Sequence, residues 1–148
     1  MHSNDFVSEY HNADHKRLDL ILRSLIDAIK EEKSQELQQS LFYLFKSGLL
    51  RHIHWEENVL FPMFDREVAT IESPTKILTA EHGEMNLVLI SIEDNLDNKI
   101  DLDKVVELAK FLEAHNVHED RVVYPAMKKL LDTDDRDLIA VTISRDFK

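Results

Sequence analysis

An eleven-residue segment occurs twice in the chain, and each copy puts a histidine and a glutamate where a helix would face its core. The first copy is His52-Ile-His-Trp-Glu-Glu-Asn-Val-Leu-Phe-Pro62, and the second is His115-Asn-Val-His-Glu-Asp-Arg-Val-Val-Tyr-Pro125. In each copy the glutamate follows the histidine by four residues, so both side chains lie on one face of a helix. Two such faces turned toward each other would form a cage of nitrogen and oxygen donors, which suits a metal ion.

The composition limits the fold to one helical domain and excludes several classes of function. A chain of 148 residues is long enough for one sizeable core, and two Gly and three Pro leave few turns, so long helices are expected. A net charge of −11 argues against nucleic acid and anionic membranes. The lack of cysteine excludes disulfides and Cys-ligated clusters. Without a signal peptide or a membrane-spanning run, the chain is expected to be cytoplasmic. A partner protein is possible but unidentified, and an output from sensing would need one.

Three polar breaks divide the chain into four predicted helices. The helices are expected at about 5–31, 35–66, 75–97 and 102–131. Ser34 and Asp101 are predicted N-caps, and Pro74 is predicted to start the third helix. Short connections make successive helices antiparallel, so the predicted fold is an all-α, up-down-up-down four-helix bundle forming a single domain. The tail, 132–148, is expected to contain at most a short fifth helix around 138–143.

Each predicted helix has an apolar stripe with steps of three and four residues, and the histidines and glutamates occupy positions in these stripes. On the second and fourth helices the stripe is predicted to continue through Val59 and Met63 and through Val122 and Ala126. The polar positions lie early in the first and third helices and late in the second and fourth. An antiparallel bundle therefore brings all of them to the same end, which predicts one shared site.

Seven side chains are the candidate metal ligands at this end of the bundle. They are His11, His15, His52, Glu56, His82, His115 and Glu119. The two halves of the chain look like copies of one helical hairpin, because Asp14-His15 resembles Glu81-His82 and each precedes its His-x3-Glu segment by a similar distance. This predicts one metal per half. Since His11 corresponds to Leu78 in the second half, the site should be asymmetric.

A count of ligands indicates two metal ions. Burying these imidazoles and carboxylates together would cost several kcal/mol for each unpaired charge, and two cations remove that cost. Two bridging carboxylates, five histidines and one bridging oxide or hydroxide leave about one of the twelve positions of two six-coordinate ions open. That position, on the ion with fewer histidines, could take a small molecule such as dioxygen. The donor set favours iron, while manganese and zinc stay open.

Several neighbouring polar residues are not expected to bind metal. His54 and His118 fall off the inward stripes. Glu57 and Asp120 point about a quarter-turn away from the ligand acids and are expected to make solvated salt bridges. Asp14 and Glu81 could accept hydrogen bonds from ligating histidines or be surface charges, and both alternatives stay open. Pro62 and Pro125 are expected to bend their helices just past the site or to end them.

The series His…His-x3-Glu…His…His-x3-Glu, with its two acid-x3-aromatic-Pro endings, resembles the hemerythrin-like (HHE cation-binding) domain over roughly residues 5–131. The resemblance implies a four-helix bundle with an oxo- or hydroxo-bridged centre of two iron ions that binds dioxygen or a related diatomic. Six positions match family ligands, with both glutamates as bridges: His15, His52, Glu56, His82, His115 and Glu119. Invertebrate hemerythrins have their extra histidine on the third helix, whereas His11 is on the first.

Three functions are weighed on this basis. The first is a binding protein whose di-iron centre takes up dioxygen or nitric oxide for storage, delivery or sensing. The second is a di-iron enzyme or an iron-donating protein that repairs damaged clusters. The carboxylate-rich Glu-x-x-His pattern of ferritin-like oxidases is missing, which counts against the enzyme. The third is an interaction bundle without metal.

Overall fold

The computed structural model describes residues 3–67, 74–123 and 125, and side chains within 12–66, 74–123 and 125. The α-helices are α1 (Ser3–Lys30), α2 (Gln35–Trp55), α3 (Phe61–Glu67), α4 (Pro74–Glu93) and α5 (Leu102–His118). Two π-helical turns extend them: η1 (Glu56–Leu60) joins α2 to α3, and η2 (Glu119–Val123) follows α5. The described part of the chain contains no strand.

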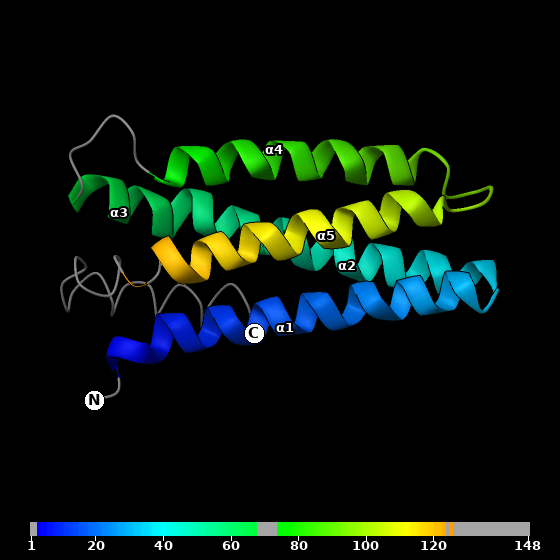
Figure 1. Cartoon of the computed structure of the whole chain (residues 1–148), viewed down its shortest axis with the longest axis horizontal. Helices are drawn as coiled ribbons and strands as arrows, with labels where there is room; N and C mark the ends of the chain where they lie inside the picture. The colour runs from blue at the N-terminus through cyan, green and yellow to red at the C-terminus, as the bar shows by residue number, and fades with distance from the viewer. Residues whose placement is uncertain (1–2, 68–73, 124, 126–148) are drawn as a thin grey trace.

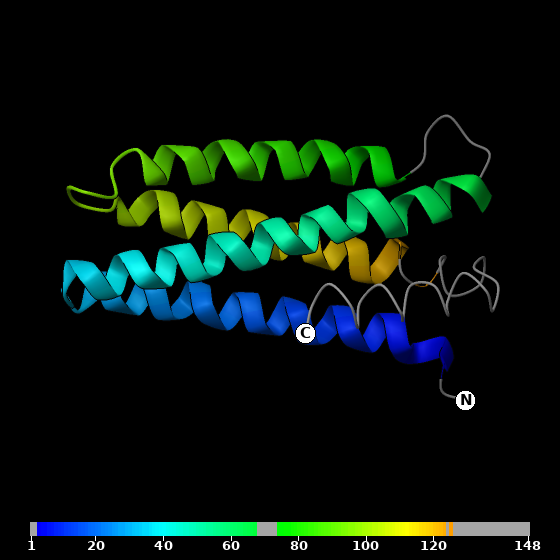
Figure 2. The ribbon, with the colours of Figure 1, turned by 180° about the vertical axis from the view of Figure 1, so that it is seen from behind.

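These elements form four antiparallel rods, namely α1, the continuous α2–η1–α3, α4, and α5 with η2 (Figure 1). Helix α1 packs against α2 and α5, and α4 packs against α5. Helix α2 meets α4 through an ion pair between Lys46 and Glu93. The view from behind shows the α2 rod in front of α5, so these two lie at opposite corners of the bundle (Figure 2). The predicted all-α bundle is confirmed.

The connections at one end of the bundle are held by local hydrogen bonds. The side chain of Ser34 caps α2 by accepting from the N–H of Leu37 at 3.2 Å, and Asp101 caps α5 by accepting from the N–H of Asp103 at 3.0 Å. Helix α1 ends where Glu32 adopts a left-handed conformation (φ 53°). Both predicted N-caps are confirmed, and Pro74 is the first residue of α4 as predicted.

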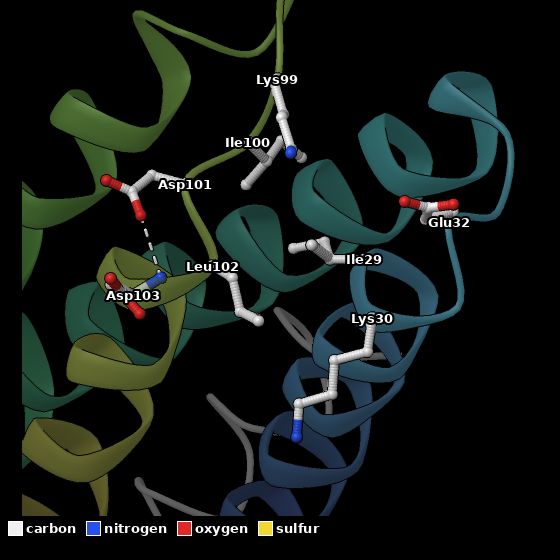
Figure 3. A pocket seen from close by; sticks show the side chains of 8 residues that line it. All are labelled: Ile29, Lys30, Glu32, Lys99, Ile100, Asp101, Leu102 and Asp103. Carbon is white, nitrogen blue, oxygen red and sulfur yellow. Dashed lines mark hydrogen bonds between the residues drawn. The ribbon is translucent and has the colours of Figure 1, made fainter.

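The same end holds a pocket of about 460 Å³ between the end of α1 and the start of α5 (Figure 3). Figure 3 also shows the hydrogen bond that caps α5 beside this pocket. The pocket is lined by Ile29, Lys30, Glu32, Lys99, Ile100, Asp101, Leu102 and Asp103. It contains no candidate ligand. It lies at the end of the bundle that carries the α1–α2 and α4–α5 connections, which we call the loop end.

The core changes from apolar to polar along the bundle axis. Leucine, isoleucine and phenylalanine side chains from all four rods fill the half nearer the loop end, among them Leu25, Phe45, Leu89 and Leu108. Toward the other end the same inward faces carry buried histidines and glutamates. The stripes therefore run as predicted up to the two glutamates.

Beyond the glutamates the predicted inward face is shifted by one residue at Val59 and Val122, whereas Met63 is buried as predicted and Ala126 lies outside the described residues. Val122 is 45% exposed, whereas Val123 is completely buried. In the first copy Leu60 is completely buried, while Val59 is only partly covered. A π turn closes its hydrogen bonds over five residues instead of four, so the next inward position comes one residue later than in an α-helix.

One predicted helix boundary also differs from the structure. Helix α4 ends at Glu93, before the predicted residue 97, and a series of turns follows it. The predicted end of the fourth helix beyond residue 125 and the tail at 132–148 lie outside the described residues. Among the described helices, none combines the length and apolar character that crossing a membrane requires.

Candidate metal centre

Six of the seven predicted ligands lie together in the polar half of the core, and every rod contributes at least one. The cluster consists of His15 from α1, His52 from α2, Glu56 from η1, His82 from α4, His115 from α5 and Glu119 from η2. All six are buried, and both glutamates are completely inaccessible to solvent. Polar groups of this kind are rarely buried without partners of opposite charge. The arrangement therefore needs compensation from cations or protons.

The donors form two overlapping groups, in each of which the ligand atoms lie within 4.8 Å of one another. One group contains His82, His115 and both glutamates, and the other contains His15, His52 and Glu119. Each group thus takes its two imidazoles from one half of the chain, as the duplicated-hairpin interpretation predicts for one metal per half.

The two glutamates lie between the halves. Glu56 has one carboxylate oxygen 3.1 Å from Nε2 of His82 and the other 3.6 Å from Nε2 of His52. Oε1 of Glu119 is 3.2 Å from Nε2 of His115 and 3.4 Å from Nε2 of His15. Each glutamate can therefore reach an ion in either half, which is the geometry that a bridging carboxylate requires.

A carboxylate of a neighbouring rod accepts a hydrogen bond from the outer nitrogen of three of the four imidazoles, those of His52, His82 and His115. Nδ1 of His52 lies 2.6 Å from Asp14, and Nδ1 of His115 lies 2.8 Å from Glu81. An ionised carboxylate only accepts hydrogen bonds, so Nδ1 must donate and Nε2 is the nitrogen turned toward the cluster. The sequence left open whether Asp14 and Glu81 are hydrogen-bond acceptors or surface charges. The structure favours hydrogen-bond acceptors for both.

The second acids of the repeated segment also contact imidazoles. Oε2 of Glu57 lies 2.6 Å from Nδ1 of His82, and Oδ1 of Asp120 lies 3.5 Å from Nδ1 of His15. Neither residue belongs to a donor group, so the prediction that they do not bind metal agrees with this placement. Both acids are partly exposed and pair with a histidine, as expected for solvated salt-bridge partners, but the sequence did not predict that these partners would be the imidazoles of the cluster.

The charges of the cluster change the pKa values of its histidines. Burial opposes protonation of His52, but the charge of Glu56 and the hydrogen bond to Asp14 outweigh it and raise the pKa of His52 to about 10. Burial likewise opposes protonation of His15 and His115, and the nearby carboxylates still raise both pKa values. Burial also disfavours the charged form of Glu56, yet His52 and His82 hold its pKa well below the ordinary value. Protons can therefore balance the acids when no metal is bound.

The donor set fits a metal of the first transition series. Nε2 of His82 and Nε2 of His115 are buried and make no hydrogen bond to the described residues, so both face the cluster with their coordinating atoms. A mixture of imidazole and carboxylate donors suits iron, manganese, zinc or copper, whereas magnesium and calcium prefer ligands that are all oxygen. The ring of Phe61 is stacked on His82 with an interplanar angle of 6°, which restricts rotation of that imidazole.

Some predicted residues lie elsewhere or remain untested. His54 is exposed and interacts with Asn58, as expected for a histidine off the inward stripe. Residue 11 belongs to α1, but the side chain of His11 lies outside the described part, so its assignment stays a prediction. The use of all seven residues as ligands likewise stays a prediction. The role of Glu57 was missed, although the repeated acid pair Glu56-Glu57 and Glu119-Asp120 was a visible signal.

Comparison with known families agrees with the geometry of the cluster. The family model of the hemerythrin HHE cation-binding domain matches residues 5–127. No curated protein and no solved structure shows a significant match to the chain. The matched segment covers most of the chain and includes all six buried donors, and the chain therefore belongs to the hemerythrin HHE cation-binding domain family.

Proposed function

We propose that this protein holds two iron ions in the buried cluster and binds dioxygen or a related diatomic such as nitric oxide there. The observation that carries the proposal is the pairing of donors, because two imidazoles from each half of the chain converge on two shared glutamates. A carboxylate-bridged ferrous pair supplies the two electrons that reversible binding of dioxygen requires. Storage, delivery and sensing are the roles that such binding would serve.

The proposed ligand set is unequal between the halves. Leu78, which corresponds to His11 in the first half, is completely buried against the core. The equivalence of the two hairpins therefore supports His11 as a fifth histidine ligand, belonging to the first half. The ion held by His82 and His115 then has one ligand fewer, and the diatomic would bind on that side.

The surroundings of the cluster favour binding over repeated oxidation. Histidine supplies most of the proposed ligands, whereas ferritin-like oxidases use a carboxylate-rich set. Buried apolar side chains, Trp55, Leu60 and Phe61, lie next to the donors in sequence and exclude water from this part of the core.

Metal analysis and spectroscopy of the purified protein test the proposal. We expect about two iron ions per chain and the near-ultraviolet absorption of an oxo-bridged ferric pair in the oxidised protein. Mixing the reduced protein with dioxygen in a stopped-flow instrument should give a stable adduct that disappears when oxygen is removed. Rapid conversion to a resting diferric state would instead indicate an enzyme. Transfer of iron to a metal-free cluster protein would indicate an iron donor, and purification without any metal would contradict a metal site.

A further inference from the structure

The two consecutive acids of η1 face different neighbours, although they are adjacent in the chain. The carboxylate of Glu56 is completely buried between His52 and His82, on the inner side of both imidazoles. The carboxylate of Glu57 is partly exposed and lies 2.6 Å from the outer nitrogen of His82. Glu56 and Glu57 therefore contact opposite nitrogens of the same imidazole, which belongs to α4.

The same arrangement occurs in η2. Glu119 is completely buried with Oε1 3.4 Å from Nε2 of His15, and Asp120 has its Oδ1 3.5 Å from Nδ1 of the same ring. An α-helix separates consecutive side chains by about 100°, and a π turn takes more residues per turn and makes this angle smaller. Both acids can then reach the adjacent helix. The π turns begin at Glu56 and Glu119 themselves, where this rotation is needed.

The remaining two imidazoles are held by the residue that precedes a ligand histidine. Asp14, next to His15, accepts from His52 across the α1–α2 contact, and Asp14 is itself buried and bonded to Arg17. Glu81, next to His82, accepts from His115 across the α4–α5 contact. Each of the four rods therefore gives one carboxylate to an imidazole of the next rod, in the order α1, α2, α4, α5 and back to α1.

We propose that these four carboxylates form a closed ring around the bundle that orients the four imidazoles before metal binds. The two π turns place two of these carboxylates, those of Glu57 and Asp120, in the ring. The members of this carboxylate ring are Asp14, Glu57, Glu81 and Asp120. The hydrogen bonds to His52, His82 and His115 fix the tautomer with Nε2 free for the metal and restrict rotation of the imidazoles, so less conformational freedom is lost on binding. The contact of Asp120 with His15 is a longer charge contact. The inference rests on the proposed histidine ligands but not on the identity of the metal.

The contacts in the ring differ in strength. Glu57 and His82 form a 2.6 Å hydrogen bond, whereas Asp120 and His15 are separated by 3.5 Å. Hydrogen bonds between an ionised acceptor and a nitrogen donor are strongest near 2.7–2.9 Å and weaken at longer distance. The contribution of Glu57 to metal affinity should therefore exceed that of Asp120.

Titration with Co²⁺, followed by its visible absorption, tests the ring without iron or dioxygen. The variants are Glu57→Gln, Glu57→Ala and Asp120→Asn, with Glu84→Gln as the control, because Glu84 is an exposed acid of α4 close to His82 in sequence. We expect the two Glu57 variants to bind Co²⁺ about 10- to 100-fold more weakly. We expect a smaller loss for Asp120→Asn and the wild-type affinity for Glu84→Gln. Equal affinity of both Glu57 variants and the control would overturn the ring.

Nuclear magnetic resonance of the metal-free protein tests orientation directly. With ¹⁵N-labelled histidine, the Nδ1–H signal of His82 should be slow to exchange in the wild type and in Glu84→Gln. It should exchange faster in Glu57→Ala, with circular dichroism showing that the fold is retained. If Glu57→Ala does not fold, the isosteric Glu57→Gln should give a smaller acceleration of exchange, because its amide oxygen is a neutral and weaker acceptor than the carboxylate. An unchanged His82 signal in a folded variant would contradict the ring. Failure of the wild type to bind Co²⁺ would instead overturn the proposed ligands.

Discussion

Replacing Glu119 with glutamine should remove both metal ions from the protein. Glu119 is the one residue that belongs to both donor groups, and its Oε1 lies 3.2 Å from Nε2 of His115 and 3.4 Å from Nε2 of His15. Glutamine keeps the shape of the side chain but carries no charge and offers a single weak oxygen ligand. The substitution therefore changes the chemistry of the site while disturbing core packing as little as a single replacement can.

The size of the effect follows from the number of bonds lost. Losing a hydrogen-bond partner of a ligand commonly costs 10- to 100-fold in metal affinity, so losing an anionic ligand should cost at least about 100-fold, or about 2.7 kcal/mol, for each ion. Because Glu119 contacts both halves, the loss applies twice. His52→Ala removes a donor from one group only, so that variant should keep about one ion per chain.

Metal content after gel filtration in the presence of a chelator measures this difference. We expect about two ions per chain in the wild type, about one in His52→Ala and almost none in Glu119→Gln. Glu113→Gln, which changes an exposed acid of α5 in the same rod, is the matched control and should retain the wild-type content. If Glu119→Gln kept one tightly held ion, Glu119 would serve a single metal, and the proposed bridge would be refuted.

Four further outcomes are expected. Chelation should lower the melting temperature by roughly 5–10 °C for each site that is filled at a hundred times its Kd, and a chelator-insensitive melting curve would oppose metal-linked stability. The pKa of His52 is raised to about 10, so protonation of this residue stabilises the metal-free fold. This contribution to the free energy of unfolding should be complete below the unfolded pKa of about 6.5 and should be lost as the pH rises toward 10. Metal binding near pH 8 should accordingly release protons, and calorimetry in buffers of different ionisation enthalpy that detected none would contradict this. His11→Leu should make the two irons equivalent by Mössbauer spectroscopy, whereas unchanged spectra would exclude His11 as a ligand. Phe45→Ala, in the completely buried apolar core, should lower the free energy of unfolding by about 3–5 kcal/mol without changing metal content, and a loss of metal would show that the two halves of the core are coupled.

The bundle and the position of the donors could be predicted because both depend on periodicity. Steps of three and four residues identify the inward face of an α-helix, and antiparallel order brings early and late positions to one end. His52 and His115, late on their helices, therefore meet His15 and His82, early on theirs. Ser34 and Asp101 were recognisable because short polar side chains satisfy the free N–H groups of a first turn.

The π turns could not be predicted in the same way, because the expected periodicity assumed four-residue hydrogen bonds throughout. The consequence was an error at Val122 and Val123, and the contact of Glu57 with His82 was not predicted. A signal was present in the sequence, since Pro62 and Pro125 follow the two π turns at equivalent distances. A proline lacks the N–H that would continue the α-helical pattern, and the five-residue hydrogen bond from Phe61 to Glu56 lies immediately before Pro62.

The buried cluster also has to be compatible with folding before any metal arrives, and its protonation makes this possible. Protons on His15, His52 and His115, whose pKa values are all raised, balance the carboxylates that surround them. The metal-free protein therefore avoids the cost of several kcal/mol that each uncompensated buried charge would carry. In the proposed metal-bound state, metal ions would replace the protons on Nε2, while the outer nitrogens would keep their contacts with the carboxylate ring. One set of acids would thus serve both states, which is consistent with six acidic side chains contacting the four buried imidazoles of the cluster.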